Sequence, residues 1–252
     1  MVNDQMVNAM RILITNDDGW GTPGIRLLAE EMSRLGEVTV IAPDSPRSGH
    51  AACISVAKPL YLTPVECDIP GVRVLTTNGT PADCVKLGLE AVMVDALPDL
   101  LVSGINHGNN CSVNIMYSGT MGACFVGAEH GIPAIGFSID SHAMDVDLQY
   151  IRPYLTQIVE HLLAEGFAPR LCYNINAPVG PIAGVRWTRQ CLGFWDKEMV
   201  EHTDAEGRTY YELGGNFVNQ EPEAQDTDIR ALADGYLSVQ PATIDMTYYA
   251  AL

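Results

Sequence analysis

Hydrophobic and polar positions alternate along the first 180 residues in two patterns, one typical of buried strands and the other of amphipathic helices. Residues 11–15 (RILIT) form a short apolar run that ends in polar side chains. Residues 25–35 then repeat apolar side chains at helical spacing, and residues 37–42 (EVTVIA) form a second apolar run. A strand, a helix and a strand of these lengths predict a parallel crossover unit.

The same alternation continues to about residue 180. We predict further strands at 72–75, 99–103, 134–138 and 171–175, and helices at 81–94, 118–131 and 148–165. Strands that are covered by helices on both faces are expected to be continuously apolar, as these are. The sequence therefore predicts an α/β fold, with a doubly wound, mostly parallel, Rossmann-like sheet.

The alternation stops near Pro181, where short extended segments rich in aromatic residues follow, separated by turns. We read this region as a β-rich C-terminal arm that does not continue the helical layers. The predicted organisation is a disordered N-terminal tail at 1–10, a Rossmann-like core at 11–180 and a C-terminal arm of the same domain at 181–252.

The amino-acid composition and net charge limit the kinds of molecule that the protein can bind. Hydrophobic residues make up 47% and charged residues 18%, which indicates a folded globular protein. Fourteen basic and 31 acidic residues leave a formal net charge of −17. Such a charge disfavours nucleic acid and anionic membranes as partners. An anionic substrate would also be repelled unless a bound cation reversed the local field.

Seven cysteines, an odd number with no C-x-x-C pair, argue against a disulfide framework or a thiolate zinc site. The chain starts without the apolar segment of a signal peptide, and no apolar run reaches the roughly 18 residues of a membrane span. These features predict a cytoplasmic protein.

Asp17 and Asp18 follow the first predicted strand, at the sheet edge where α/β proteins bind ligands. Adjacent carboxylates repel each other unless a cation binds, and oxygen ligands suit Mg²⁺. The pair therefore indicates a metal site, although Asp18 could equally cap the next helix while Asp17 is solvated.

Gly19, Gly21 and Gly24 spell G-x-G-x-x-G between a strand and a helix, and Asp44 ends the next strand. This combination resembles a dinucleotide-binding fingerprint. Two features oppose it: the two preceding aspartates would repel a pyrophosphate, and Pro23 removes an N–H donor near the helix start. The alternative function is that of a dinucleotide- or nucleotide-binding Rossmann-type protein without hydrolase activity.

Three further segments fall at the same predicted edge. Residues 103–110 (SGINHGNN) include Asn106, whose amide oxygen could bind a metal, although turns also favour Asn and Gly. Ser118, Gly119 and Thr120 precede a predicted helix, where hydroxyls and free N–H groups make either an anion site or an ordinary cap. Residues 45–50 (SPRSGH) bring a hydroxyl, a guanidinium and an imidazole.

These segments place several groups at one predicted edge of the sheet: paired carboxylates, a hydroxyl, an amide and the anion-binding N-terminus of a helix. Together they suit metal-assisted phosphoryl chemistry. The six histidines lack the H-x-x-x-H and H-E-x-x-H spacings of zinc hydrolases. The G-x-S-x-G elbow of acyl hydrolases is absent as well.

The ordered motifs resemble SurE, the survival protein E family of 5′-nucleotidases, over residues 11–247, nearly the whole chain. They are RILITNDDG (11–19), APD with RSGH (42–50), TNGTPADCV (77–85), VSGIN (102–106), YSGT (117–120), NINAP (174–178), TRQ (188–190) and DTD followed by GY (226–236). The resemblance implies a divalent-metal-dependent phosphatase that hydrolyses nucleoside monophosphates to nucleoside and phosphate.

The resemblance also implies site residues. One divalent cation per subunit, Mg²⁺ or Mn²⁺, would bind Asp17, Asp18, Ser48 and Asn106, with the two aspartates catalytic. The phosphate would bind Asn106, Ser118, Gly119 and Thr120. The subunits would form a homodimer or homotetramer through an exchanged C-terminal arm. The resemblance does not specify the preferred base or the preference for 5′ or 3′ phosphates. It also leaves open whether water or Asp17 is the nucleophile and whether His50 or His107 is the general acid.

This chain departs from the family pattern at two places. Arg47-Ser48 and Gly49-His50 are contiguous, where the family usually separates them by one or two residues. The segment that begins at Asn106 carries His107, where relatives commonly carry an arginine and a proline in that stretch. A histidine is positive there only when it is protonated.

Overall fold

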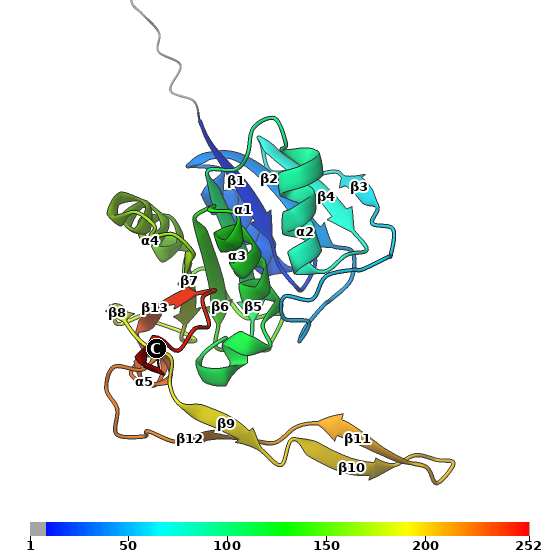
Figure 1. The fold of residues 1–252 in the computed structure, drawn as a ribbon, viewed down its shortest axis with the longest axis vertical. Coiled ribbons are helices and arrows are strands. Elements are labelled where there is room, and N and C mark those ends of the chain that lie inside the picture. Colours follow the sequence, from blue (N-terminus) through cyan, green and yellow to red (C-terminus); the bar gives the residue numbers. More distant parts are fainter. Residues whose placement is uncertain (1–8, 252) are drawn as a thin grey trace, which may run out of the picture.

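The computed structural model describes residues 9–251, which form a central nine-stranded sheet with a helical layer on each face and a projecting hairpin (Figure 1). The α/β fold class is confirmed. Most of the predicted N-terminal tail, residues 1–8, lies outside the described residues. Met10 is already the first residue of a strand.

The main sheet has the order β3-β4-β2-β1-β5-β6-β7-β13-β8. β1, β2, β4, β5, β6 and β7 run parallel to one another, β3 is antiparallel to β4, and β13 is antiparallel to β7 and parallel to β8. Its strands are β1 (Met10–Thr15), β2 (Gly36–Pro43), β3 (Leu62–Val65), β4 (Val72–Thr77), β5 (Leu100–His107), β6 (Ala134–Ile139), β7 (Leu171–Ala177), β8 (Val185–Trp187) and β13 (Leu237–Thr243).

The helices form two layers, one on each face of the sheet. The helices are α1 (Pro23–Met32), α2 (Pro81–Leu87), α3 (Gly119–Glu129), α4 (Arg152–Glu165) and α5 (Asp228–Ala233), with shorter helical turns at Gly88–Val92, Ser112–Met116 and Tyr249–Ala251. α1 packs with α4 on one face, and α2 with α3 on the other. Burial of apolar side chains between these layers and the sheet is the main stabilising term.

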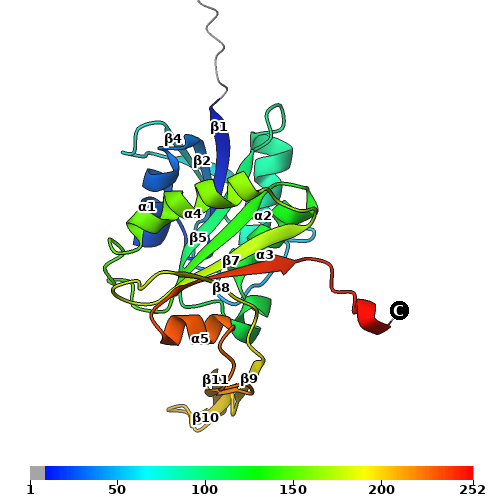
Figure 2. The same cartoon turned by 90° about the vertical axis from the view of Figure 1, so that its left-hand side faces the viewer.

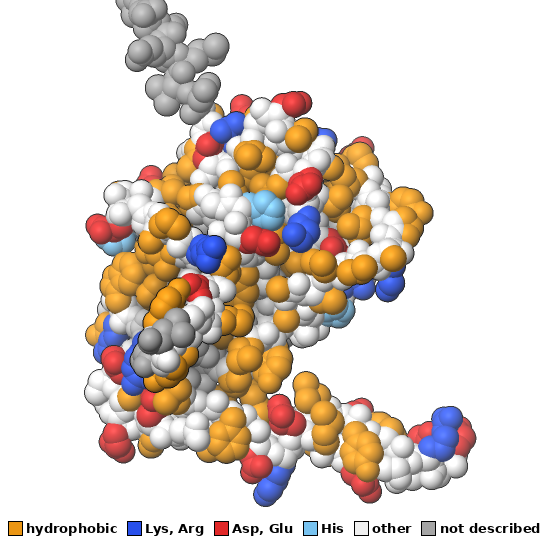
Figure 3. All heavy atoms as spheres, in the orientation of Figure 1, with side chains coloured by type: hydrophobic (Ala, Val, Ile, Leu, Met, Phe, Trp, Pro, Cys, Tyr) orange, Lys and Arg blue, Asp and Glu red, His pale blue; other side chains and the backbone are white. Residues whose placement is uncertain are grey.

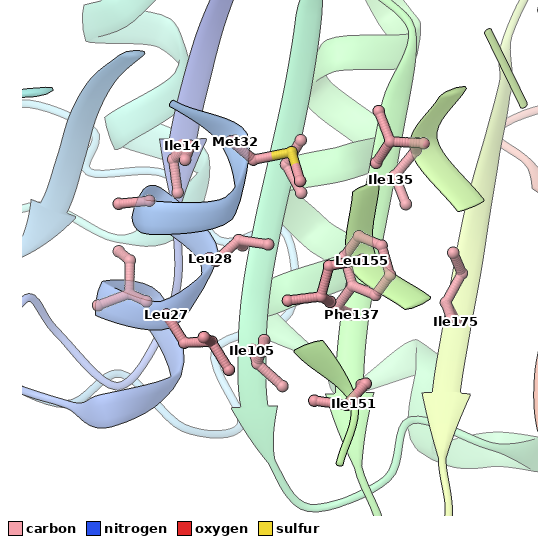
Figure 4. Packing of buried hydrophobic residues seen from close by; sticks show 14 of the residues in the cluster. Ile14, Leu27, Leu28, Met32, Ile105, Ile135, Phe137, Ile151, Leu155 and Ile175 are labelled. Carbon is pink, nitrogen blue, oxygen red and sulfur yellow. The ribbon is translucent and has the colours of Figure 1, made fainter. Parts of the chain in front are cut away.

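Figure 4 shows the α1–α4 side of the core, where helix side chains interleave with strand side chains. Leu28 of α1 and Leu155 of α4 are fully buried, as are Ile105 of β5 and Phe137 of β6. Successive side chains along a strand point to opposite faces of the sheet. The same strands therefore pack against the helical layers on both faces.

Several predicted boundaries need correction. The strand predicted at 99–103 continues to His107, because it keeps pairing with β6 after a register shift between Ser103 and Asn106. Asn106 therefore lies in a strand and not in a loop. The helix predicted from residue 148 starts at Arg152, and the edge strand β3 was not predicted at all.

The region after Pro181 divides into two parts, which corrects the view of 181–252 as an arm throughout. β8 and β13 join the main sheet beside β7 (Figure 2), because β13 pairs with β7 over six residues. Residues 193–219 form a long antiparallel hairpin that projects from the body (Figure 1). Its strands are β9 (Gly193–Asp196), β10 (Met199–Thr203), β11 (Thr209–Leu213) and β12 (Asn216–Asn219).

The strand order places a topological switch point beside β1. The chain passes from β1 to β2 on one side and later returns to β5 on the other side of β1. Doubly wound sheets bind their ligands in the crevice at the carboxyl ends of such strands. The ends of β1 and β5 carry Asp17, Asp18 and Asn106.

Candidate functional site

Asp17 is the centre of a buried polar cluster at the carboxyl end of β1. Its side chain is only 4% exposed. Thr120 Oγ1 donates a hydrogen bond to Asp17 Oδ1 at 2.7 Å. Gly119 packs so closely that a Cβ at that position would lie 2.9 Å from Asp17 Cβ. The structure therefore brings Asp17 together with the start of α3, as expected for these residues.

Burial and the charge of Asp18 raise the pKa of Asp17 to about 6, although the Thr120 hydrogen bond opposes the shift. A buried carboxylate with a like charge beside it is costly to ionise. A cation at this point would relieve that cost. The electrostatics of the site thus favour a positively charged ligand.

The end of β5 lies against Asp18. The backbone N–H of His107 donates to Asp18 Oδ2 at 3.4 Å, and His107 Nδ1 lies 3.3 Å from the same oxygen. Asn106 Nδ2 donates to the carbonyl oxygen of Gly108 at 2.7 Å. This bond orients the amide, and Asn106 Oδ1 accepts no hydrogen bond within residues 9–251. The amide oxygen is therefore free to bind a ligand.

Ser48 belongs to the loop after β2, which is tied to the same place by its backbone. The N–H of Arg47 donates to the Asp17 carbonyl oxygen at 2.7 Å. Arg47 NH2 donates to the carbonyl oxygen of Asn78 at 3.0 Å, so the guanidinium is committed to a neighbouring loop. Ser48 is exposed, and the structure gives no contact between its hydroxyl and either aspartate. Ser48 is placed near the site but not in contact with it.

The two candidate acids differ in their surroundings. His107 has a buried side chain beside Asp18, and its Nε2 has no hydrogen-bond partner in the described part of the chain. His50 is exposed, and its Nδ1 lies 3.1 Å from the Ser48 carbonyl oxygen of its own loop.

The start of α3 presents free backbone donors. Ser118 caps the helix, its Oγ accepting from the Met121 N–H at 3.0 Å, and the Gly122 N–H donates to the Ser118 carbonyl oxygen. The intervening N–H groups, of Gly119 and Thr120, make no hydrogen bond within the described residues. Unpaired amides at a helix start bind phosphate oxygens. The cap and the anion site are thus compatible here.

The donor set fits a hard divalent cation. Two carboxylates follow the end of β1 and one free amide oxygen lies near the end of β5, and such oxygen ligands suit Mg²⁺ or Mn²⁺. Within residues 9–251 no three His, Cys, Asp or Glu side chains cluster in a manner suited to a metal. A cation bound here would therefore need ligands such as Asn106, the substrate or water besides the two aspartates.

The glycine motif has a packing explanation. A Cβ at Gly24 would lie 2.2 Å from the Ile105 carbonyl oxygen, so this glycine lets α1 approach β5. Gly19 has a φ of +91°, which a turn requires. A Cβ at Gly21, where a dinucleotide site needs room for the pyrophosphate, would meet nothing within 4 Å. These contacts account for two of the three glycines without a dinucleotide.

The motif NINAP (174–178) was singled out in the sequence, but the chain of buried amides that it forms was not predicted. Asn110 N–H donates to Asn176 Oδ1 at 2.7 Å, Asn176 Nδ2 to Asn174 Oδ1 at 3.1 Å, and Asn174 Nδ2 to Gln240 Oε1 at 3.0 Å. Asn110 Nδ2 also donates to Ser138 Oγ. Two asparagines spaced i, i+2 in the otherwise apolar strand at 171–177 were the available signal.

Comparisons with known proteins find relatives over nearly the whole chain. A family model described as "Survival protein SurE" matches residues 12–197. A protein named 5′-nucleotidase SurE from Cytophaga hutchinsonii is 42% identical over 244 residues, covering 96% of this chain and 93% of that protein. One of the same name from Bacteroides thetaiotaomicron is 41% identical over 239 residues, covering 94% and 92%.

A solved structure shares the fold. The crystal structure of the SurE protein from Aquifex aeolicus matches with a TM-score of 0.83 at 32% identity, covering 96% of each chain. The order of motifs, the family match over most of the chain and this structural similarity lead to one conclusion: the chain belongs to the SurE family.

Proposed function

We propose that this chain is a divalent-metal-dependent 5′-nucleotidase, which hydrolyses nucleoside monophosphates to nucleoside and inorganic phosphate. The observation that carries the proposal is the contact of Asp17 with the start of α3. It places a buried carboxylate with a raised pKa beside unpaired helix amides. The carboxylates favour a cation and the helix amides favour a phosphate, which together suit a phosphate monoester and a metal.

Each group has a distinct task in this proposal. Asp17, Asp18 and the Asn106 amide oxygen would hold one Mg²⁺ or Mn²⁺, with Ser48 reaching in from its loop. When bound, the cation supplies Lewis-acid stabilisation of the charge on the phosphoryl oxygens. The Gly119 and Thr120 N–H groups orient the phosphate, and the positive end of α3 favours its negative charge. The Thr120 hydroxyl holds Asp17 in place.

Phosphate release from a panel of nucleoside 5′- and 3′-monophosphates tests the proposal. We expect release with added Mg²⁺ or Mn²⁺ and none with EDTA. If EDTA leaves phosphate release unchanged, the activity does not depend on a metal. If no phosphate is released with either metal, the chain is not a nucleotidase. Titration with NAD, followed by fluorescence, tests the dinucleotide alternative, which the glycine contacts disfavour.

Thr120→Ala is expected to weaken metal binding more than it weakens the fold. Loss of the hydroxyl removes a hydrogen bond that favours the charged form of Asp17, so the pKa of Asp17 rises further. We expect the metal concentration for half-maximal activity at pH 7 to rise by about tenfold, the equivalent of roughly 1.4 kcal/mol. Thr120→Ser, which keeps the hydroxyl, is the control. Equal behaviour of the two variants would contradict this role.

We also propose that the hairpin joins subunits into a dimer or tetramer. Hydrophobic side chains lie along it (Figure 3), and Met199 and Leu213, which pair across β10 and β11, are 66% and 77% exposed. Exposed apolar patches of this kind are typical of protein interfaces. The root of the hairpin is anchored to the body, because Trp195 Nε1 donates to Asn114 Oδ1 at 2.8 Å.

The double variant Met199→Ser with Leu213→Ser tests this assembly. We expect light scattering to report a smaller species than for the unmodified chain, because the apolar contact is lost. Val94→Ser, at an exposed valine in the turn after α2, is the control and keeps the original mass. If the double variant keeps the mass of the unmodified chain, the hairpin does not form the interface between subunits.

A cytoplasmic location completes the proposal. All seven cysteines are free, and five of them are buried. Free thiols are typical of a reducing compartment. In the part of the chain that the structure describes, no helix is long and apolar enough to cross a membrane.

A further inference from the structure

A cavity of about 520 Å³, here called the β13 cavity, opens next to the candidate site between α3, the Ser112–Met116 turn and β13. Ile115, Phe125 and Ala242 contribute apolar walls. No aspartate or glutamate lines it, although the chain carries 31 acidic residues. A mostly apolar cavity of this size with a few polar groups is typical of a small-molecule site.

The β13 cavity shares a wall with the phosphate-binding segment. Ser118 lines the cavity, and the next residue, Gly119, packs against Asp17. Successive Cα atoms are about 3.8 Å apart, so the cavity wall and the contact with Asp17 lie one residue apart on the same segment. Ala51 also lines the cavity, and its N–H donates to the Tyr117 carbonyl oxygen. The loop that carries Ser48 therefore continues into the cavity wall.

Gln240 gives the cavity a directed hydrogen-bond donor. Its side chain is 4% exposed, and it lines the cavity. The backbone N–H of Asn110 can only donate, which fixes Asn176 Oδ1 as its acceptor and, in turn, the orientation of Asn174. Asn174 Nδ2 then donates to Gln240 Oε1, so the oxygen of Gln240 faces the amide chain. Its Nε2 makes no hydrogen bond within the described residues.

We propose that the β13 cavity takes the nucleoside part of the substrate, with Gln240 Nε2 donating to an acceptor atom of the base. The inference rests on the proposed nucleotidase function and names its leaving-group subsite. An aromatic base suits the apolar walls, and a ring nitrogen or carbonyl oxygen suits a buried donor that is otherwise unpaired. Gln240 is thus a specificity-determining residue, held by the amide chain.

Two variants test the cavity. Gln240→Met keeps the volume and removes the donor, while Asn174 Nδ2 keeps its bond to the Asn110 carbonyl oxygen. Ala52→Phe fills the cavity from an exposed position on its wall. Ala168→Phe, at an exposed alanine outside the cavity, is the matched control.

The measurement is kcat/KM for nucleoside 5′-monophosphates relative to that for ribose 5-phosphate, which has the same sugar and phosphate but no base. We expect the ratio to fall about three- to tenfold in Gln240→Met and at least about tenfold in Ala52→Phe. The control keeps the original ratio. Titration calorimetry with free nucleosides is expected to show binding to the unmodified chain and to Asp18→Asn but not to Ala52→Phe.

The outcomes separate this inference from the proposed function. Hydrolysis of nucleotides with an unchanged ratio in both cavity variants overturns the inference and leaves the nucleotidase intact. Nucleoside binding without any phosphate release supports the cavity and overturns the nucleotidase. If Ala52→Phe changes the subunit assembly but not the ratio of the two kcat/KM values, another copy of the chain fills the cavity. This outcome also overturns the inference.

Discussion

Asp17→Asn is expected to lower kcat/KM by at least about 10³-fold, the equivalent of roughly 4 kcal/mol, because it removes a carboxylate from the metal and phosphate cluster. The same substitution is expected to stabilise the metal-free protein. Asparagine keeps an acceptor for Thr120 but carries no charge that must be buried. Activity and stability therefore move in opposite directions, which a purely structural residue would not show.

The stability gain depends on pH with a defined sign. The pKa of Asp17 is about 6 when folded and near 3.8 when unfolded, so the folded state loses stability as the pH rises between these values. We expect Asp17→Asn to gain on the order of 3 kcal/mol at pH 8 with EDTA and little at pH 3.5. Urea unfolding at the two pH values measures the difference.

Asp99→Asn is the matched control for Asp17→Asn. Asp99 pairs with Arg11 at the opposite end of the same two strands. It is expected to keep the original activity, since it lies at the amino ends of β1 and β5. If Asp17→Asn retained full metal-dependent turnover, the assignment of the site would be wrong.

Gly24→Ala is expected to have the largest effect on stability. Its Cβ would lie 2.2 Å from the backbone oxygen of Ile105, and backbone cannot rotate away as a side chain can. α1 must therefore move off β5, at a cost on the order of 3 kcal/mol. For a chain of this length that corresponds to a fall in Tm of roughly 10 °C.

Gly21→Ala is the control within the same motif, because a Cβ there meets nothing within 4 Å. Thermal unfolding of both variants is expected to leave Gly21→Ala within about 0.5 kcal/mol of the unmodified protein. Comparable losses in the two variants would show that the motif is constrained by something other than the contact between α1 and β5.

The strands and helices of the core were predictable because their pattern is local. A continuous apolar run such as residues 11–15 has to be buried on both faces, which only a covered strand allows. The cap of α2 is equally local, because the Thr80 hydroxyl accepts from the N–H of Asp83, three residues later. The continuation of β5 to His107 was not predictable, because it depends on pairing with β6.

The C-terminal region shows the same limit. Short extended segments were predicted after Pro181, but not that two of them, β8 and β13, would complete the main sheet. A short apolar strand has the same sequence pattern in a hairpin and at a sheet edge. Its place in the fold depends on which neighbouring strand offers unpaired backbone groups. β13 finds that partner in β7, which lies about 60 residues earlier in the chain.

The sequence by itself determined the alternation of strands and helices, the family and the segments that meet at the edge of the sheet, because these follow from side-chain type and order. Only the tertiary structure decided how the groups are used. It committed the Thr120 hydroxyl to Asp17, left Ser48 exposed, and joined Asn174 to Gln240, a residue that lines a cavity. Hydrogen bonds between distant residues depend on position and direction in space, which the order of residues does not state.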